Sequence, residues 1–306
     1  MLLYMAPLEG ITKYSYRNIH RKHFAEADRY FTPFISMSRK LSSKVKNDIE
    51  PSHNEGIDII PQIMVANTFE TLYLSNLLLD KYGYNHLNIN AGCPSGTVVT
   101  KYRGAGLLRD HENLHSFLEE LFSESRPTQY SIKLRMGYKD VSEWENISKI
   151  IGEYPFTEVI IHGRVREEFY NGTAHRECLH IAGENIKSSI CYNGDIYTYE
   201  DYSELTTEFP WLEKVMIGRG ILRNPGLFNE IKTKQPTDNK AIFAFMDELF
   251  ESYLDLFRND INTLYHIKEL WFYLGQRYPE KEKDLKIIRK TKSIPEYKDA
   301  VRRILL

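Results

Sequence analysis

The stretch Ser131-Ile132-Lys133-Leu134-Arg135 decides between the folds open to this 306-residue chain. Side chains alternate between the two faces of a strand, so Ile132 and Leu134 point one way and the other three residues point the other way. The apolar pair suits a layer of covering helices, which places Lys133 on the interior face. An ammonium group buried without a partner is costly, and a bound anion would remove that cost. The alternative is an internal Lys–Glu pair, for which the sequence offers no evident inward-facing acid.

Short β-rich runs alternate with amphipathic, helix-like segments along most of the chain. Strands are predicted at 2–5, 30–35, 59–64, 86–90, 130–134, 158–162, 189–193 and 214–218, with helices between them such as 68–82, 112–123 and 143–153. A repeat of about 29 residues fits an eight-stranded barrel. An open, doubly wound sheet would alternate in the same way.

The positions of the polar residues separate these two folds. They end six of the predicted strands, as Gln62, Asn90, Lys133 with Arg135, His162, Asn193, and Gly218 with Arg219. A barrel carries its chemistry at this edge of many strands, whereas an open sheet concentrates it at one switch point. We therefore predict an α/β fold, a (β/α)8 TIM barrel, over residues 1–232.

The pattern changes after Ile231. A polar linker over 232–240 leads to predicted helices at 241–257, 264–278, 283–292 and 295–305, which indicates a small all-α domain over 241–306. Residues 258–306 hold 12 lysines and arginines against 7 acids, while the rest of the chain holds 28 against 35. A basic segment on an acidic body is typical of contact with nucleic-acid phosphates, although a solvated helical face has the same composition.

The composition, 42% hydrophobic and 27% charged, is that of an ordinary globular protein. No apolar run is long enough to span a bilayer, and the first residues lack the basic region of a signal peptide. Three widely spaced cysteines, Cys93, Cys178 and Cys191, indicate no disulfide framework and no zinc site. We therefore expect a reduced, cytoplasmic protein without membrane or metal binding.

The segment Asn90-Ala91-Gly92-Cys93-Pro94 holds a cysteine in a tight turn beyond a predicted strand. A free thiol has a pKa of about 8.5, so without an adjacent basic cluster it stays protonated and can act as a proton donor. A small buried hydrophobic residue is the usual state of a free cysteine and suits Cys178 and Cys191 better.

Two glycine turns follow the seventh and eighth predicted strands, Asn193-Gly194-Asp195 and Gly218-Arg219-Gly220. Barrels often bind phosphate in these loops, where glycines let backbone N–H groups approach the anion. Together with the inward-facing Lys133, these turns indicate a cofactor that carries phosphate.

Seven motifs in this order resemble the flavin-dependent tRNA-dihydrouridine synthases. They are Ala6-Pro7-Leu8-Glu9-Gly10-Ile11-Thr12, Pro61-Gln62, Asn90-Ala91-Gly92-Cys93-Pro94, Lys133-Leu134-Arg135-Met136-Gly137, His162-Gly163-Arg164, Asn193-Gly194-Asp195 and Gly218-Arg219. The resemblance is dense over residues 1–232. It continues more loosely at Leu264-Tyr265-His266-Ile267-Lys268, which resembles the family's helical tRNA-binding domain.

The resemblance implies an enzyme that contains FMN and uses NADPH to reduce uridine in tRNA to 5,6-dihydrouridine. Cys93 would protonate C5 of the uracil, and Asn90 and Arg135 would help to hold the base. The residues that would line the FMN are Pro7, Gln62, Lys133, His162, Asn193, Gly194, Asp195, Gly218 and Arg219. A monomer is the expected oligomeric state.

Two rival interpretations stay open. A flavin barrel acting on a free pyrimidine, as in dihydroorotate dehydrogenases, would share the cofactor edge but has no use for a basic C-terminal segment. A non-catalytic RNA-binding protein would have no reason to keep Cys93 and Lys133 together. The motifs also leave open which uridine is reduced, whether the RNA is transfer or ribosomal, and whether NADPH or NADH is preferred.

Overall fold

Ten short strands form one sheet in the computed structural model, which describes residues 1–38, 40–123 and 125–306. The strands are β1 (Leu2–Met5), β2 (Arg29–Phe31), β3 (Ile35–Ser36), β4 (Ile59–Ile60), β5 (Gln62–Met64), β6 (His86–Ala91), β7 (Gln129–Gly137), β8 (Glu158–Val165), β9 (Ser189–Asn193) and β10 (Lys214–Ile217). Their order in the sheet is β3-β5-β6-β7-β8-β9-β10-β1-β2-β4.

This parallel sheet closes on itself. The predicted second strand appears as β2 and β3, and the predicted third as β4 and β5; β2 pairs with β4, and β3 pairs with β5. The two ends of the sheet are therefore joined, which confirms the predicted eight-stranded barrel. The continuous strands predicted at 30–35 and 59–64 are wrong in detail, because Pro33 and Pro61 stand at the breaks and proline has no N–H to donate.

A buried cluster fills the interior of the barrel. Its members come from six strands or their ends: Tyr4, Ala6, Phe31, Ile60, Ile160, Cys191 and Met216. At the amino-terminal end of β8, the buried carboxylate of Glu158 accepts hydrogen bonds from the hydroxyl of Tyr4 at 3.0 Å and the ammonium of Lys214 at 2.7 Å. This acid is engaged at the first residue of β8, away from the strand ends that carry the predicted site.

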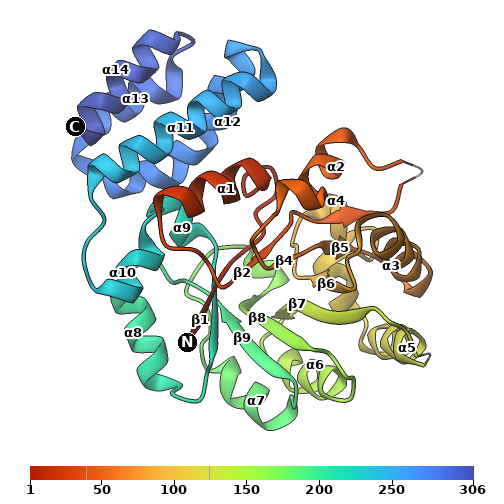
Figure 1. Ribbon diagram of the computed structural model, residues 1–306. Coiled ribbons are helices and arrows are strands. Elements are labelled where there is room, and N and C mark those ends of the chain that lie inside the picture. The colour runs from red at the N-terminus through yellow and green to blue at the C-terminus, as the bar shows by residue number, and fades with distance from the viewer. Residues whose placement is uncertain (39, 124) are drawn as a thin grey trace. The chain divides into compact units, whose positions relative to one another are not determined.

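Helices cover the outside of these strands (Figure 1). They are α2 (Ser43–Ile49), α3 (Thr68–Tyr82), α5 (His111–Phe122), α6 (Glu143–Gly152) and α7 (Cys178–Asn185), while the short α4 (Gly96–Val99) belongs to the loop after β6. The predicted helix at 68–82 is confirmed at both ends. The Asn67 side chain accepts the N–H of Glu70 at its start, and Gly83, with φ +76°, ends it by donating to the carbonyls of Leu78 and Leu79.

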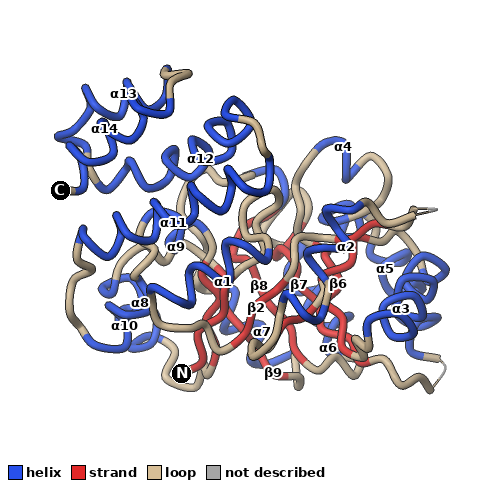
Figure 2. Tube along the Cα trace, turned by 45° about the horizontal axis from the view of Figure 1, so that its top comes forward, coloured by secondary structure: helices blue, strands red, loops and turns tan. Residues whose placement is uncertain are grey.

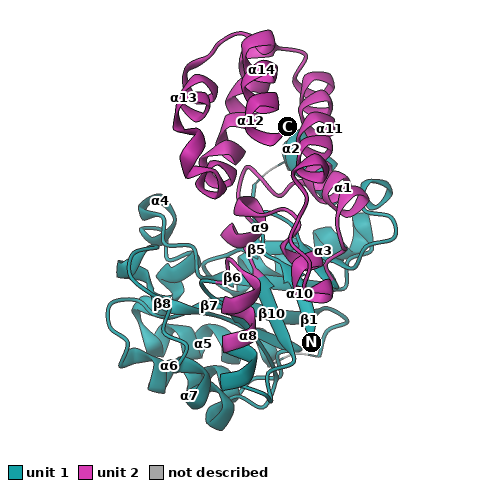
Figure 3. Ribbon diagram, turned by 90° about the vertical axis from the view of Figure 1, so that its left-hand side faces the viewer, with its two compact units in different colours: residues 1–7, 28–195, 205–216 teal, residues 8–27, 196–204, 217–306 magenta. Residues whose placement is uncertain are grey.

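The chain divides into two compact units (Figure 3). Unit 1 holds residues 1–7, 28–195 and 205–216, and unit 2 holds residues 8–27, 196–204 and 217–306. The helices of unit 2 are α1 (Tyr14–His23), α9 (Arg219–Arg223), α10 (Leu227–Thr233), α11 (Asn239–Phe257), α12 (Asp260–Leu274), α13 (Glu282–Lys290) and α14 (Ile294–Leu305), while α8 (Tyr199–Glu208) is shared between the units. The C-terminal helical region is thus present, and the domain boundary at 232–241 stays a prediction.

Unit 2 has an aromatic core of its own. The buried His20 ring packs edge-on against Phe228 and Phe245, and its Nε2 lies 2.7 Å from the carbonyl oxygen of Pro225. Burial lowers the pKa of His20 to about 4, so the imidazole is neutral near pH 7. Helices α11 to α14 contain no strand between them (Figure 2). No helix within the described ranges has both the length and the apolar character needed to cross a membrane.

Candidate active site

Lys133 points into the barrel, as the alternation predicts. Residues in register on parallel strands share a face, and Lys133 is in register with Ile160, which is in register with Cys191. Both belong to the interior cluster. The Lys133 side chain is half-buried, and within the described part of the chain its ammonium has no hydrogen bond or ion pair. Burial, with a smaller contribution from the Arg135 guanidinium, lowers the pKa of Lys133 to about 8.

Three buried side-chain amides form a hydrogen-bonded row next to Lys133. Asn90, in register with Lys133, donates from Nδ2 to Oε1 of Gln62 at 2.7 Å. Gln62 donates from Nε2 to Oδ1 of Asn88 at 2.8 Å, and Asn88 donates to the hydroxyl of Ser131 at 2.9 Å. These hydrogen bonds join only neutral groups, so the row provides no negative charge that could neutralise Lys133.

The loop that carries Cys93 is fixed by the end of β6. The side-chain oxygen of Asn90 accepts the backbone N–H groups of Gly92 at 3.1 Å and Cys93 at 2.9 Å. Cys93 itself is half-buried, whereas Cys178 and Cys191 are fully buried. Asn90 thus sets the position of the thiol at the strand edge.

Gly104 packs directly on the Cys93 backbone, with φ +57°. A Cβ at this position would lie 2.8 Å from the carbonyl oxygen of Cys93, closer than real Cβ contacts allow. The next residue, Ala105, donates its N–H to the same oxygen at 3.0 Å. The glycine is therefore required both by its left-handed backbone and by the close approach.

Arg135 is fully buried and holds three loop carbonyls. Its guanidinium donates to the oxygen of Gly92 at 3.0 Å, of Val165 at 2.8 Å and of Phe169 at 2.6 Å. Burial lowers the pKa of Arg135 to about 10, which still leaves it charged near neutral pH. Arg135 therefore fastens the loops that follow β6 and β8 to the end of β7.

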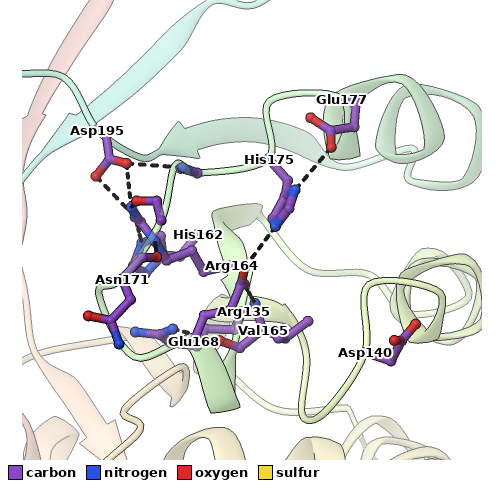
Figure 4. Close-up of polar contacts among 12 residues, drawn as sticks. Arg135, Asp140, His162, Arg164, Val165, Glu168, Asn171, His175, Glu177 and Asp195 are labelled. Atoms are coloured by element: carbon purple, nitrogen blue, oxygen red, sulfur yellow. Dashed lines mark hydrogen bonds and ion pairs between the residues drawn. The ribbon is translucent and has the colours of Figure 1, made fainter.

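Arg164 and Asp195 form a bidentate ion pair at the ends of β8 and β9 (Figure 4). Arg164, which is fully buried, also donates to the carbonyls of Asn171 at 3.0 Å and Gly172 at 2.6 Å. Asp195 accepts the N–H of Ala174 at 3.0 Å as well. Both charges are satisfied by the protein itself, so this pair holds the loop after β8 in place.

The remaining predicted residues lie in two places. His162, Arg135 and Asn193 are in register across three adjacent strands, and Nδ2 of Asn193 donates to the carbonyl of Met216 at 2.8 Å. Gly194 and Pro7 are half-buried in the same unit. Gly218 and Arg219 belong to unit 2, where Gly218 precedes α9 and the Arg219 guanidinium lies 5.6 Å from the centre of the Tyr197 ring.

Arg164 is a site residue to which the sequence analysis assigns no role of its own, although it is part of the motif His162-Gly163-Arg164. The signal was available, because His162 and Arg164 are two residues apart and share one face of β8. An arginine at such a position needs an acid, and Asp195 ends the neighbouring strand.

The family model described as dihydrouridine synthase matches residues 4–290. A probable tRNA-dihydrouridine synthase of Staphylococcus aureus (strain COL) is 28% identical over 256 residues, covering 78% of this chain and 72% of that protein. The tRNA-dihydrouridine synthase B of Pasteurella multocida (strain Pm70) is 26% identical over 291 residues, covering 94% of this chain and 81% of the other.

Among solved structures, morphinone reductase aligns with a TM-score of 0.52 at 12% identity, covering 77% of this chain and 86% of that chain. At this identity the likeness shows the barrel fold alone. The family match spans most of the chain and confirms the resemblance that the motifs indicate. With its barrel and the ordered strand-end motifs, this chain belongs to the dihydrouridine synthase family.

Proposed function

We propose that this protein reduces uridine in tRNA to 5,6-dihydrouridine, with FMN as the bound flavin and NADPH as the reductant, as a cytoplasmic monomer. The relatives named tRNA-dihydrouridine synthases support the RNA class and the reaction. The observation that carries the proposal is the Lys133 ammonium, which faces the barrel interior without an anionic partner among the described residues. Such a group is expected where a ligand supplies the missing negative charge.

The residues around Lys133 suit a flat, hydrogen-bonding cofactor that becomes anionic. Lys133 would hold the flavin ring, where a cation would favour the anionic reduced form. Gln62, His162 and Asn193 would hydrogen-bond the ring, and Gly218 and Arg219 would hold the phosphate. Pro7, Gly194 and Asp195 complete the lining, with Asp195 acting through its ion pair with Arg164.

When bound, FMN supplies the hydride that C6 of the uracil accepts. Uracil is electron-poor at C6 because this carbon is conjugated with the C4 carbonyl, so accepting a hydride leaves enolate character on C5. Cys93 then protonates C5: its S–H bond breaks as the new C–H bond forms, and the thiolate regains a proton from solvent. Asn90, whose Nδ2 has one N–H beyond its bond to Gln62, and Arg135, with the N–H groups that do not hold the loops, would help to hold the base.

The test compares Cys93→Ala with Cys178→Ala, which removes a buried thiol outside the strand-end site. Flavin reoxidation by unmodified tRNA is followed by anaerobic stopped flow after reduction with NADPH. Cys93→Ala should bind FMN and accept electrons normally but reoxidise about 10²–10⁴ times more slowly, the usual effect of losing a general acid. Cys178→Ala should keep the wild-type rate. A wild-type rate in Cys93→Ala would refute the acid role, and purified protein that neither contains nor takes up FMN would refute the function.

A further inference from the structure

Aromatic rings and guanidinium groups alternate along the rim of the barrel. The Cζ of Arg109 lies 5.2 Å from the centre of the Tyr102 ring and 5.5 Å from that of Tyr138. The Cζ of Arg166 lies 5.5 Å from the centre of the Tyr138 ring and 4.8 Å from that of Phe169. We call these five residues the stacking ladder. They follow β6, β7 and β8, so the ladder lies at the strand ends that carry the active site.

Hydrogen bonds fasten the stacking ladder to the Cys93 loop. Nε of Arg166 donates to the carbonyl of Pro94 at 3.1 Å, directly after Cys93. Phe169 is held through its own carbonyl by Arg135, which also holds Gly92 on the other side of the cysteine. A molecule bound on the ladder would therefore lie next to the proposed proton donor.

Both ends of the ladder are exposed in a backbone conformation that favours glycine. Tyr102 is 53% exposed with φ +54°, and Phe169 is 40% exposed with φ +51°. Tyr102 follows α4, where its N–H donates to the carbonyl of Val99 and the N–H of Arg103 to that of Val98, a turn that usually takes glycine. A large residue with a positive φ has a strained backbone, and an exposed ring gains little free energy from burial. Packing therefore does not explain why aromatic residues stand at these two positions.

A pocket of about 460 Å³ opens beside the ladder at Tyr102. Apolar side chains such as Leu107 and Phe117 line it together with Asn67, Lys101 and Asn113, so it can accept a flat ligand with an apolar face and a polar edge. Charge at the ladder is mixed: Lys101, Lys139 and the two arginines stand against Asp110, Asp140 and Glu167. Glu167 pairs with Arg166 at 2.8 Å, and Asp110 caps α5. Stacking, rather than a strong positive charge, is thus the main interaction that this surface offers.

We infer that the stacking ladder binds unpaired nucleotides of the RNA substrate next to the target uridine, with the outermost base on Tyr102. This inference rests on the proposed function for its RNA. Unpaired bases stack on aromatic rings and guanidinium planes, and each stack commonly changes affinity about 5- to 150-fold on alanine substitution. Cations between the rings suit nucleobases better than an apolar protein surface.

The test uses Tyr102→Gly and Phe169→Gly in the full-length protein, with unmodified tRNA and a short single-stranded RNA as probes. Each variant should raise the Kd for both RNAs by about 5- to 150-fold. Thermal stability should stay unchanged or rise, because glycine relieves the left-handed strain. Tyr102→Phe should keep wild-type affinity, as should Tyr73→Ala, which removes a 39%-exposed tyrosine of α3 outside the ladder.

An unchanged Kd in both glycine variants would overturn the inference, as would an equal loss of affinity in Tyr73→Ala. A lower melting temperature with unchanged RNA binding in the glycine variants would mean that the ladder only stabilises the loops. Bound flavin and dihydrouridine formation are measured separately on the same preparations. A protein that binds RNA through the ladder but forms no dihydrouridine would refute the proposed function, and only RNA binding by the ladder would be left standing.

Discussion

Replacing Lys133 with methionine should stabilise the ligand-free protein while it weakens flavin binding. The pKa of Lys133 falls from 10.5 to about 8 on folding because burial disfavours the charged form. At pH 7 that shift would correspond to about 3–4 kcal/mol of destabilisation for a fully buried group, and to about 2–3 kcal/mol once the partial exposure of the side chain is allowed for. Methionine keeps the length of the side chain and removes the charge. For a chain of 306 residues, the ligand-free variant should therefore melt about 3–5 °C higher than the wild type.

The sign of the effect can be tested through pH. Because folding lowers the pKa of a base, the destabilisation is complete below pH 8 and is lost as the pH rises to 10.5, where the unfolded chain also loses its proton. The advantage of Lys133→Met should accordingly shrink over this range in calorimetry of flavin-free samples in phosphate-free buffer. Titration with FMN should show weaker binding at pH 7. A variant that is less stable than the ligand-free wild type at pH 7 would refute the reasoning, since it would mean that the protein itself already neutralises Lys133.

Two further predictions concern the Cys93 loop and unit 2. Gly104→Ala should lower the free energy of unfolding and slow flavin reoxidation, whereas Gly83→Ala, with φ +76° and open space around it, should show the effect of backbone strain alone. If urea unfolding showed the same loss of unfolding free energy in both variants, and Gly104→Ala reoxidised its flavin at the wild-type rate, the close packing of Gly104 on Cys93 would be contradicted. Replacing Lys283, Lys286 and Lys290 of α13 with glutamine should lower the slope of log K against log salt for tRNA by about 2–3, because these exposed lysines have no ion pair within the described residues. A slope that stays the same in filter binding would remove α13 from the RNA contact.

The barrel could be predicted because its strand–helix repeat and the polar residues at its strand ends are visible in the sequence, and the inward direction of Lys133 because side chains alternate along a strand. The same alternation puts Asn88 and Asn90 on one face of β6, where both lie in one hydrogen-bonded row. The strand breaks at Pro33 and Pro61 followed from proline chemistry and could have been read from the sequence. The alternation also indicates that Arg164 needs an acid, but the loop carbonyls that Arg164 holds, those of Asn171 and Gly172, could not be predicted, because their position depends on how the loop after β8 folds in space.

The family motifs identify the site residues but do not say which of them bind a ligand and which hold the loops. The internal hydrogen bonds of each residue distinguish these two roles. Asn90, Arg135 and Asp195 each make several internal hydrogen bonds, so much of their bonding capacity shapes the loops around the site. A charged group left without a partner in a buried place destabilises the fold, and it persists where a ligand compensates. Lys133 is such a group in the barrel interior. Its unsatisfied charge is therefore the part of this site that points to a ligand rather than to the architecture that holds one.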